Sequence, residues 1–240
     1  MTELLYQMDS YVKEFSAVVT DLVPDLHGVI LDQTIFYPGG GGQPYDIGEL
    51  IQPDRVFSVT RMKRHAGSPV HVIQAENPLP EIDSQLSGKI DWDRRYQLMR
   101  THTAMHILCG VVFRDYGALV TGGDMDPLKG RMDFEFESMH KDLVEEIEAS
   151  INAEMHKGHE VAVRILPRQE AFQIPDLIRT KINLLPENIQ QVRVVEIVGL
   201  DLQADGGTHV HNTAEVGPIR VVDYKSKGKI NKRIYVELAE

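Results

Sequence analysis

The sequence predicts an α+β fold in which a small N-terminal β-barrel-like domain precedes an α+β domain with an antiparallel sheet. Residues 15–76 contain several Val- and Ile-rich segments separated by Gly, Pro and Asp, the pattern of short strands joined by turns. Residues 91–117 and 138–158 instead have the apolar spacing and the end signals of helices. Strand-like segments follow these helices, and this order of elements is typical of the α+β class.

Four segments of the N-terminal part are predicted strands. They are "FSAVVTDLV" at 15–23, "GVILDQTIF" at 28–36, "DRVFSVTRM" at 54–62 and "SPVHVIQAE" at 68–76. The next stretch, "ENPLPEIDSQLSG" at 76–88, is polar, contains proline and lacks a helical period, and these features indicate a domain boundary. We therefore predict two domains, residues 1–88 and residues 89–240, the first of which carries a glycine-rich loop.

The second domain is predicted to contain two helices among strands. Asp91 is a good N-cap and Gly117 a good C-terminal stop for the first helix, whose dense apolar residues indicate burial. Ser138 is expected to cap a second, amphipathic helix that ends at Gly158. The strands are predicted at 131–137, 160–166, 191–198, 217–224 and 233–238, with a turn at 226–232 before the last of them.

Length, composition and charge exclude several classes of protein. A chain of 240 residues with 42% hydrophobic residues can bury a full core. It contains no apolar run of membrane-spanning length, and its first residues carry acids where a signal peptide needs a basic end. The single cysteine, Cys109, cannot form an internal disulfide, so a reducing cytoplasm is expected. The net charge of −11 argues against broad affinity for nucleic acid.

Two groups of histidines indicate a metal site. His102 and His106 lie four residues apart on the first predicted helix, so both rings project from one face. Asp205 and His209 have the same separation in a glycine-rich turn between strands. Together the four side chains offer nitrogen and oxygen ligands suited to zinc. Cys109 lies on the same helical stripe as His102 and is either a further ligand or, more simply, a buried core residue.

The glycine-rich loop "FYPGGGGQP" at 36–44 needs an explanation, because four glycines give up much backbone entropy on folding. It is no P-loop, since Gln43 and Pro44 follow where Lys and Ser or Thr are required. It is no dinucleotide fingerprint either, because Pro44 and Gly48 argue against a helix directly after it. A flexible surface loop and a wall of a binding site both remain open.

The sequence resembles a known family, the free-standing alanyl-tRNA editing proteins of the AlaX type. The segments "RTHTAMHILCG", "LKGRMDFEFE", "DLQADGGTHVHNTAEVG" and "KSKGKINKRIYVEL" are similar to the editing domain of alanyl-tRNA synthetase. The segment "LDQTIFYPGGGGQPYDIG" is similar to the glycine-rich segment that accompanies that domain. The resemblance covers nearly the whole chain in the right order, and the aminoacylation and anticodon-side parts of the synthetase are absent.

The resemblance implies one zinc ion per chain, held by HxxxH and a later CxxxH. His102, His106 and His209 match three of these positions, whereas Asp205 stands where the family has cysteine. The fourth ligand is then either an oxygen of Asp205, or a water molecule, or Cys109.

The resemblance also assigns residues to the substrate. Gln43 matches a glutamine that contributes to editing, and the bare backbone of Gly39, Gly40, Gly41 and Gly42 would allow close approach of a terminal adenosine and a small aminoacyl group. Arg131 is likewise assigned to substrate binding. The hydroxyl of Thr34 is expected either to meet that of a seryl group in catalysis or to be satisfied within its own strand.

The implied activity is hydrolysis of the ester of alanine tRNA mischarged with serine or glycine. A pocket for alanine cannot strongly exclude either, because one methyl or hydroxyl group is worth only about 1–3 kcal/mol. Zinc would either activate water or orient the substrate. Alternatives are the related threonyl-type editing activity and a non-catalytic, zinc-stabilised module that binds RNA or a synthetase, for which a closed site of four protein ligands is expected.

The implied partner is the acceptor end of alanine tRNA, with no membrane and no nucleotide cofactor involved. Basic residues gather near the first helix and near the C-terminal turn, and we expect them to meet phosphates. They are Arg94, Arg95, Arg100, Lys225, Lys227, Lys229, Lys232 and Arg233. From spacing alone, a solvated hairpin and helix face is equally compatible.

Overall fold

The computed structural model describes residues 2–183, 185 and 189–239. The chain forms two compact units: Met1–Gly40 with Pro44–Tyr96, and Gly41–Gln43 with Gln97–Glu240. The predicted fold class is confirmed, because a closed barrel is followed by helices and antiparallel sheets. The predicted division at residue 88 stays a prediction; these units place residues 89–96 with the first and 41–43 with the second.

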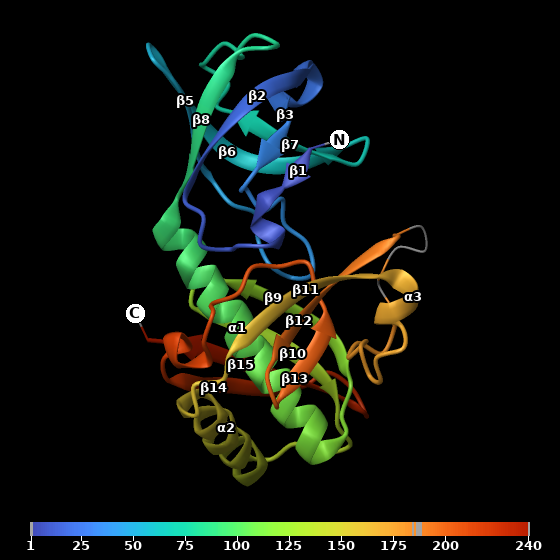
Figure 1. Cartoon of the computed structure of the whole chain (residues 1–240). Helices are drawn as coiled ribbons and strands as arrows, with labels where there is room; N and C mark the ends of the chain where they lie inside the picture. The colour runs from blue at the N-terminus through green and yellow to red at the C-terminus, as the bar shows by residue number, and fades with distance from the viewer. Residues whose placement is uncertain (1, 184, 186–188, 240) are drawn as a thin grey trace. The chain divides into compact units, whose positions relative to one another are not determined.

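The first unit is a barrel closed by antiparallel strands (Figure 1). Its strands follow one another in the order β2 (Glu14–Val23), β3 (Gly28–Leu31), β7 (Ser68–Ile73), β6 (Arg55–His65), β5 (Gly48–Gln52) and β8 (Gln85–Ile90). Apolar side chains such as Phe15, Phe36 and Phe57 fill the interior. A short parallel pair, β1 (Glu3–Leu4) and β4 (Gln33–Thr34), and the turns η1 (Leu5–Gln7) and η2 (Pro24–Leu26) complete this unit.

Strand β8 is a feature that the sequence prediction missed. Residues 85–88 fall in the stretch predicted as a domain boundary, but β8 pairs with β2 on one side and β5 on the other and so closes the barrel. Alternate residues of β8 are buried, and Gly88 lies so close to the ring of Phe15 that an added Cβ would be 2.1 Å from it. Polar residues and glycine mask this alternation in the sequence.

Helix α1 (Trp92–Tyr116) confirms the first predicted helix. The side chain of Asp91 accepts a hydrogen bond from the backbone N–H of Arg94 at 3.0 Å, which makes it the expected N-cap. Gly117 ends the helix with a φ of 63°, a left-handed conformation that glycine adopts without strain. From Leu98 onward most residues of α1 are buried, which explains why its apolar residues show no single stripe.

The second unit contains two antiparallel sheets (Figure 1). One has the order β14 (Ile219–Ser226), β15 (Asn231–Leu238), β10 (Lys129–Glu135) and β9 (Val120–Asp126). The other has the order β11 (Val161–Pro167), β12 (Gln191–Ile197) and β13 (Asp201–Ala204). Helix α2 (Lys141–His156) packs against β14, and the short elements α3 (Arg168–Ala171) and η3 (Thr213–Val216) lie in the connections.

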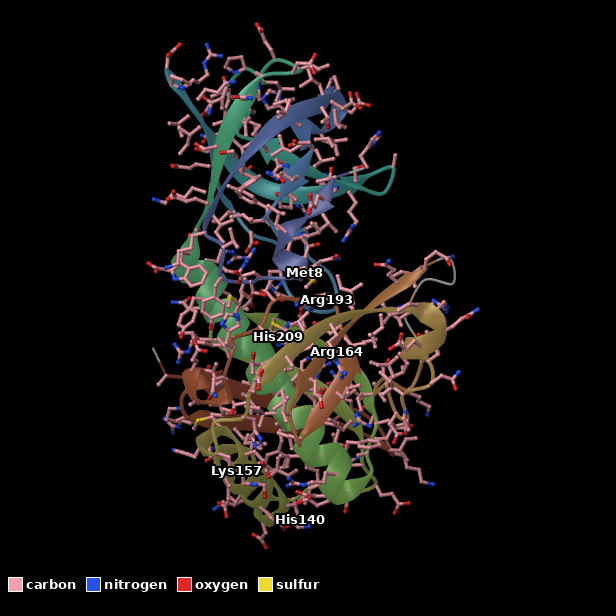
Figure 2. The ribbon with its side chains drawn as sticks, viewed as in Figure 1. Met8, His140, Lys157, Arg164, Arg193 and His209 are labelled. Carbon is pink, nitrogen blue, oxygen red and sulfur yellow. The ribbon has the colours of Figure 1, made fainter. Side chains whose placement is uncertain are left out.

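The start of α2 corrects the sequence prediction. His140, not Ser138, is the N-cap: its Nδ1 accepts a hydrogen bond from the backbone N–H of Leu143. Figure 2 shows His140 at the beginning of this helix and Lys157 at its end. Ser138 lies too far before the first turn to reach the free N–H groups. Among the residues described, no helix has the length and apolar character needed to cross a membrane.

Candidate metal centre and substrate cavity

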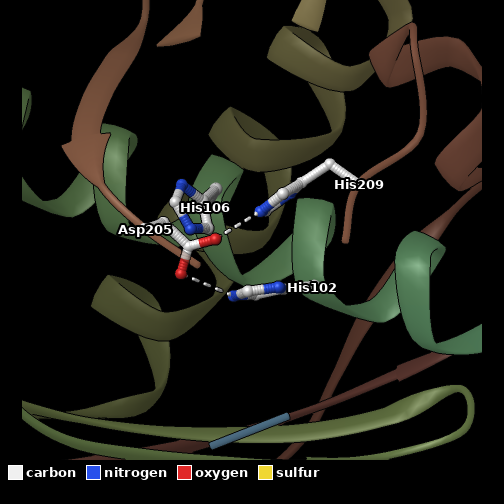
Figure 3. Close-up of side chains that lie close together, drawn as sticks. All are labelled: His102, His106, Asp205 and His209. Atoms are coloured by element: carbon white, nitrogen blue, oxygen red, sulfur yellow. Dashed lines mark hydrogen bonds and ion pairs between the residues drawn. The ribbon is translucent and has the colours of Figure 1, made fainter. Parts of the chain in front are cut away.

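Four side chains from two segments of the second unit form a compact cluster. His102 and His106 project from α1, while Asp205 and His209 lie in the loop that follows β13 (Figure 3). One potential ligand atom from each residue lies within 4.8 Å of the others. The sequence spacing therefore grouped side chains that the fold does bring together.

The spacing of these atoms fits a small tetrahedral ion. Ligands at about 2.0–2.2 Å from a tetrahedral zinc ion lie about 3.4 Å from one another. Asp205 Oδ2 is 3.0 Å from His209 Nε2, and Asp205 Oδ1 is 3.6 Å from His102 Nε2. All three histidines are at least nine-tenths buried, so water competes little for their ring nitrogens. The donor set, three imidazoles and one carboxylate, can hold a divalent metal ion.

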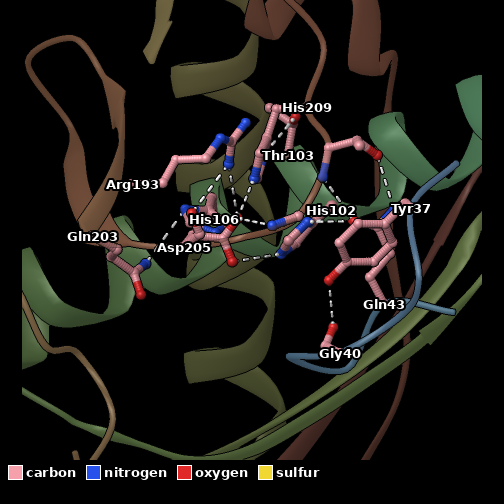
Figure 4. A network of polar contacts seen from close by, with 12 residues as sticks. Tyr37, Gly40, Gln43, His102, Thr103, His106, Arg193, Gln203, Asp205 and His209 are labelled. Atoms are coloured by element: carbon pink, nitrogen blue, oxygen red, sulfur yellow. Dashed lines mark hydrogen bonds and ion pairs between the residues drawn. The ribbon is translucent and has the colours of Figure 1, made fainter. Parts of the chain in front are cut away.

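Each histidine also meets a different polar group through its other ring nitrogen, and Figure 4 shows Gln43 and Thr103 among these partners. His102 Nδ1 lies 3.0 Å from Oε1 of Gln43. The corresponding partners are Oδ2 of Asp201 for His106, at 3.1 Å, and Oγ1 of Thr103 for His209, at 3.2 Å. These contacts leave the three Nε2 atoms for the centre of the cluster, an arrangement typical of metal-binding histidines.

Asp201 and Thr103 were not identified from the sequence. Asp201 is almost fully buried and also receives hydrogen bonds from Gln203 Nε2 at 2.6 Å and Arg179 Nε at 3.3 Å. The available signals were weak: Asp201 opens the segment that carries Asp205, and Thr103 is simply adjacent to His102.

Burial and charge set the protonation of the cluster. Burial lowers the pKa of His102 to about 4, although the charge of Asp205 opposes this. Burial and the neighbouring His102 hold the pKa of His209 well below its ordinary value. At His106 burial is outweighed by the hydrogen bond and charge of Asp201, which raise its pKa. Burial likewise fails to raise the pKa of Asp205, which the adjacent histidines hold well below its usual range.

Asp205 is held by its surroundings in the loop. The backbone N–H of Gly207 donates to its Oδ2 at 2.7 Å, and Arg193 Nη1 lies 3.7 Å from the same oxygen. Arg193 Nη1 also donates to the backbone carbonyl of Asp205 at 3.1 Å. The carboxylate therefore has a fixed direction and a compensating positive charge behind it.

Cys109 lies outside this cluster. Its side chain is buried, and burial together with the charge of Asp201 raises the pKa of the thiol well above its ordinary value. A thiol of this kind is a poor source of thiolate, the form that binds metals. The geometry thus favours Asp205 over Cys109 as the fourth side chain.

A cavity of about 680 Å³ in the second unit opens onto the cluster. His102, His106 and Asp205 line it together with Gly41, Gly42 and Cys109. Segments 120–125 and 177–182 supply much of the remaining wall, including the apolar side chains of Leu177 and Ile178. The cavity therefore joins three of the four clustered side chains to solvent-accessible space.

Residues 41–43 of the glycine-rich loop contribute backbone to this cavity. Gly41 has a φ of 58°, and an added Cβ would meet nothing within 4 Å. Gly42 has a φ of 89° and lies against the backbone of Gly123, and its carbonyl accepts a hydrogen bond from Met125 N–H at 3.1 Å. Gly39 and Gly40, also assigned to substrate, belong to the first unit and have positive φ angles as well.

The remaining side chains assigned to substrate have other partners. The Thr34 hydroxyl is fully buried in the first unit, 2.8 Å from His71 Nε2, and accepts a hydrogen bond from Phe36 N–H. The hydroxyl is thus satisfied inside the first unit, although its partner His71 lies on β7 and not, as the alternative had it, within the strand of Thr34. Arg131 on β10 is partly exposed, lies 3.3 Å from Asp124 and is not among the residues that line the cavity.

The basic residues expected to contact tRNA are unequally accessible. Arg95 is completely buried against Asp46, so the structure argues against a phosphate contact there. Lys232 is also buried and donates to the backbone carbonyls of Gly228 and Lys229, so it stabilises its own turn. Arg94 donates to the carbonyl of Tyr45.

The other basic residues expected to contact tRNA are more exposed, but several of them already bind another group of the protein. Arg100 donates to the backbone carbonyls of Val216 and Ala239. Lys225 pairs with Asp223, and Arg233 with Asp133. Lys227 and Lys229 are exposed in the turn between β14 and β15. The positive charge of this hairpin is therefore partly neutralised.

Comparison with known proteins agrees with this architecture. Residues 4–94 match the family described as "tRNA synthetases class II (A)", and residues 192–235 match the "Threonyl and Alanyl tRNA synthetase second additional domain". The second match includes Asp205 and His209. The two matches thus relate the barrel, and the segment that carries Asp205 and His209, to domains of class II tRNA synthetases.

Relatives that match along the whole chain narrow this class. The chain is 43% identical to the alanyl-tRNA editing protein AlaX-M of Saccharolobus solfataricus, over 98% of each chain, and 36% identical to that of Methanosarcina barkeri, over the full length of both. It is also 37% identical to the alanine–tRNA ligase of Pyrococcus abyssi, over 92% of this chain but 24% of the ligase. The chain belongs to the family of AlaX-M alanyl-tRNA editing proteins.

Proposed function

We propose that this protein hydrolyses the aminoacyl ester of alanine tRNA mischarged with serine or glycine, using one zinc ion held by His102, His106, His209 and Asp205. The observation that carries the proposal is the opening of this cluster onto a cavity walled in part by bare glycine backbone. The relatives named alanyl-tRNA editing proteins, which match over the full chain, support the same conclusion.

The chemistry of the cluster suits ester hydrolysis. A zinc ion held there would supply Lewis-acid chemistry, by polarising either a water molecule or the ester carbonyl. The three Nε2 atoms and the ionised carboxylate would hold it, with Asp201 and Thr103 orienting two of the rings. The cavity volume of about 680 Å³ lies within the range of about 300–1,000 Å³ typical of small-molecule sites, which is room for a terminal aminoacyl nucleoside.

A purely structural metal site is the main alternative, and the cavity argues against it. Structural zinc sites are closed by four protein ligands, the same number as in this cluster, and need no access, whereas a zinc ion that polarises water or an ester would have to take up a further ligand or exchange one. Here three of the four side chains line a cavity, so a substrate has a route to the centre. Threonyl-type editing is disfavoured because the relatives that match over the full chain are named for alanine.

The partner we propose is the acceptor end of alanine tRNA, with no nucleotide cofactor. Exposed Lys227 and Lys229 remain the best candidates for phosphate contacts, because they lie in an open turn. A cytoplasmic location is proposed from the single, buried cysteine.

A deacylation assay tests the proposal directly. The protein is incubated with serine-, glycine- and alanine-charged alanine tRNA and with serine-charged threonine tRNA, before and after removal of metal by a chelator. We expect rapid hydrolysis of the first two substrates, little of the others, and loss of activity on chelation that zinc restores. If metal analysis shows that the chelated protein contains no zinc and hydrolysis is nevertheless unchanged, zinc has no role in the reaction.

Matched histidine variants locate the metal. His102→Ala and His106→Ala should each lose zinc and activity, whereas His211→Ala should lose neither, since His211 is exposed and lies outside the cluster. Full zinc content in a His102→Ala/His106→Ala double variant would refute the assignment.

A further inference from the structure

Both polar atoms of the Gln43 amide have hydrogen-bond partners within the protein. The side chain is 2% exposed, and its Oε1 lies 2.9 Å from the backbone nitrogen of Thr208 and 3.0 Å from His102 Nδ1. Its Nε2 donates to the hydroxyl of Thr208 at 2.8 Å. Both lone pairs of the amide oxygen are thus engaged, and Gln43 is not among the residues that line the cavity.

These contacts determine which nitrogen of His102 carries a proton. A backbone N–H can only donate, so the amide atom that faces Thr208 N must be the oxygen. The same oxygen faces His102 Nδ1, and an amide oxygen only accepts, so Nδ1 must carry the hydrogen. Nε2 of His102 is therefore the atom with a free lone pair, and it is directed toward Asp205.

We propose that Gln43 is a positioning residue for the metal centre: it holds His102 in the Nδ1–H tautomer and in the ring orientation that presents Nε2 to the metal. This inference rests on the proposed metal site, and it replaces a direct contact between Gln43 and substrate. It also gives the glycine-rich loop a role in metal binding, because residues 41–43 carry the glutamine to the helix.

The glycines around this contact support the assignment. A Cβ at Gly207 would lie 2.3 Å from Cε1 of His102 and 2.6 Å from Oε1 of Gln43, so the turn allows the ring and the amide to meet only because it has no side chain there. On the other side, Gly42 lies against Gly123, and its hydrogen bond with Met125 fixes the start of the loop. Contacts at Gly42 and at Gln43 thus hold this short segment in place.

Removing an outer partner of a metal-binding histidine typically costs about 10–100-fold in metal affinity. We therefore expect Gln43→Met, which fills the same space without a strong acceptor, to bind zinc about 10–100-fold more weakly. Gln43→Glu keeps the accepting oxygens for His102 and Thr208, and the Thr208 hydroxyl can turn to donate instead. This variant should retain affinity within a few-fold of the wild type.

The experiment measures metal affinity without tRNA, so its outcome is independent of whether the protein deacylates anything. Zinc affinity is measured by competition with a chromophoric chelator, and the ligand geometry is followed by the visible absorption of the Co²⁺-loaded protein. Asn212→Ala is the control for general destabilisation. Its side chain caps η3 and donates to the carbonyl of Gly158, so its hydrogen bonds are made with residues other than the four clustered ones.

A weakened affinity and altered Co²⁺ spectrum in Gln43→Met, with wild-type behaviour in Gln43→Glu and Asn212→Ala, would establish the role. Wild-type affinity and an unchanged Co²⁺ spectrum in Gln43→Met would overturn it; slower deacylation in the same variant would then assign Gln43 to the substrate instead. Long-range ¹H–¹⁵N spectra of the metal-free wild type give a test that needs no variant. An Nε2–H tautomer at His102 would refute the inference.

Discussion

Replacing Gly207 by alanine gives a sharp test of how the metal centre is packed. The backbone of Gly207 has no positive φ, so alanine introduces no backbone strain there. The new Cβ would instead lie 2.3 Å from Cε1 of His102, 2.5 Å from its Nδ1 and 2.6 Å from Oε1 of Gln43. Ordinary contacts of a Cβ begin at about 3.4 Å, so the ring and the amide must move by about 1 Å.

The expected effect has two parts. Overpacking of a well-packed site costs about 1–3 kcal/mol in the free energy of unfolding, or about 2–12 °C in Tm for a domain of this size. A ring displaced by about 1 Å can no longer reach a zinc ion at about 2.1 Å, so one ligand is lost as well. Zinc should then bind at least 10-fold more weakly than in the wild type.

The neighbouring residue supplies a matched control. A Cβ at Gly206 would meet nothing within 4 Å, and its φ is not positive either. Gly206→Ala should therefore keep wild-type zinc affinity and Tm, both measured with and without chelator. Gly206 lines the cavity, so only metal binding and stability are compared. If Gly207→Ala binds zinc as tightly as Gly206→Ala, the proposed packing of His102 is wrong.

The remaining predictions concern three acidic residues. Asp205→Cys should retain zinc, because zinc accepts thiolate readily, whereas Asp205→Ala should bind zinc weakly. Elemental analysis after dialysis distinguishes the two variants. Unchanged zinc content in Asp205→Ala would exclude a ligand role for Asp205. Asp201→Ala should weaken zinc binding about 10–100-fold by freeing the ring of His106; an unchanged affinity in competition titrations would show that this outer contact is dispensable. Burial acts to raise the pKa of Glu154, but hydrogen bonds from its basic partners outweigh it and lower the pKa to about 2. The stabilisation is therefore fully present above about pH 4.5 and is lost as the pH falls through 2. In urea unfolding, Glu154→Gln should accordingly cost about 1–3 kcal/mol near pH 6, a range set low because two of the partners are about half exposed. The cost should be much smaller near pH 2, where about half of Glu154 is protonated in the folded state. An equal loss at both pH values would contradict this reasoning.

Local signals predicted the helical part of the site well. The Asp91 cap, the stop at Gly117 and the dense apolar residues between them define α1, and a separation of four residues places His102 and His106 on one face. The glycine pair in the loop after β13 also suggested that Asp205 and His209 face one ion. These are features whose physics lies within one turn of chain.

Contacts between distant parts of the chain were not predictable in the same way. Strand β8 is defined by pairing with β2 and β5, and its own composition resembles a linker. Arg95 looked like a phosphate contact because nothing in the sequence shows that Asp46 neutralises and buries it. Asp201 and the partners of Gln43 were hidden for the same reason, since only the fold brings them to the histidines.

The candidate metal centre therefore depends on three segments, of which only the helix can form by local interactions. The three segments, which are residues 41–43, the turn at 205–209 and α1, meet at His102. Gln43 and His102 are separated by 59 residues in the sequence, and Gln43 and Thr208 by 165 residues. Bare glycine backbone at Gly42 and Gly207 is what allows segments so distant to approach. A metal ion that binds only this assembled state stabilises all three segments together, by RT ln(1 + [L]/Kd). Metal binding would thus offset, in the same part of the structure, the backbone entropy that the glycines lose on folding.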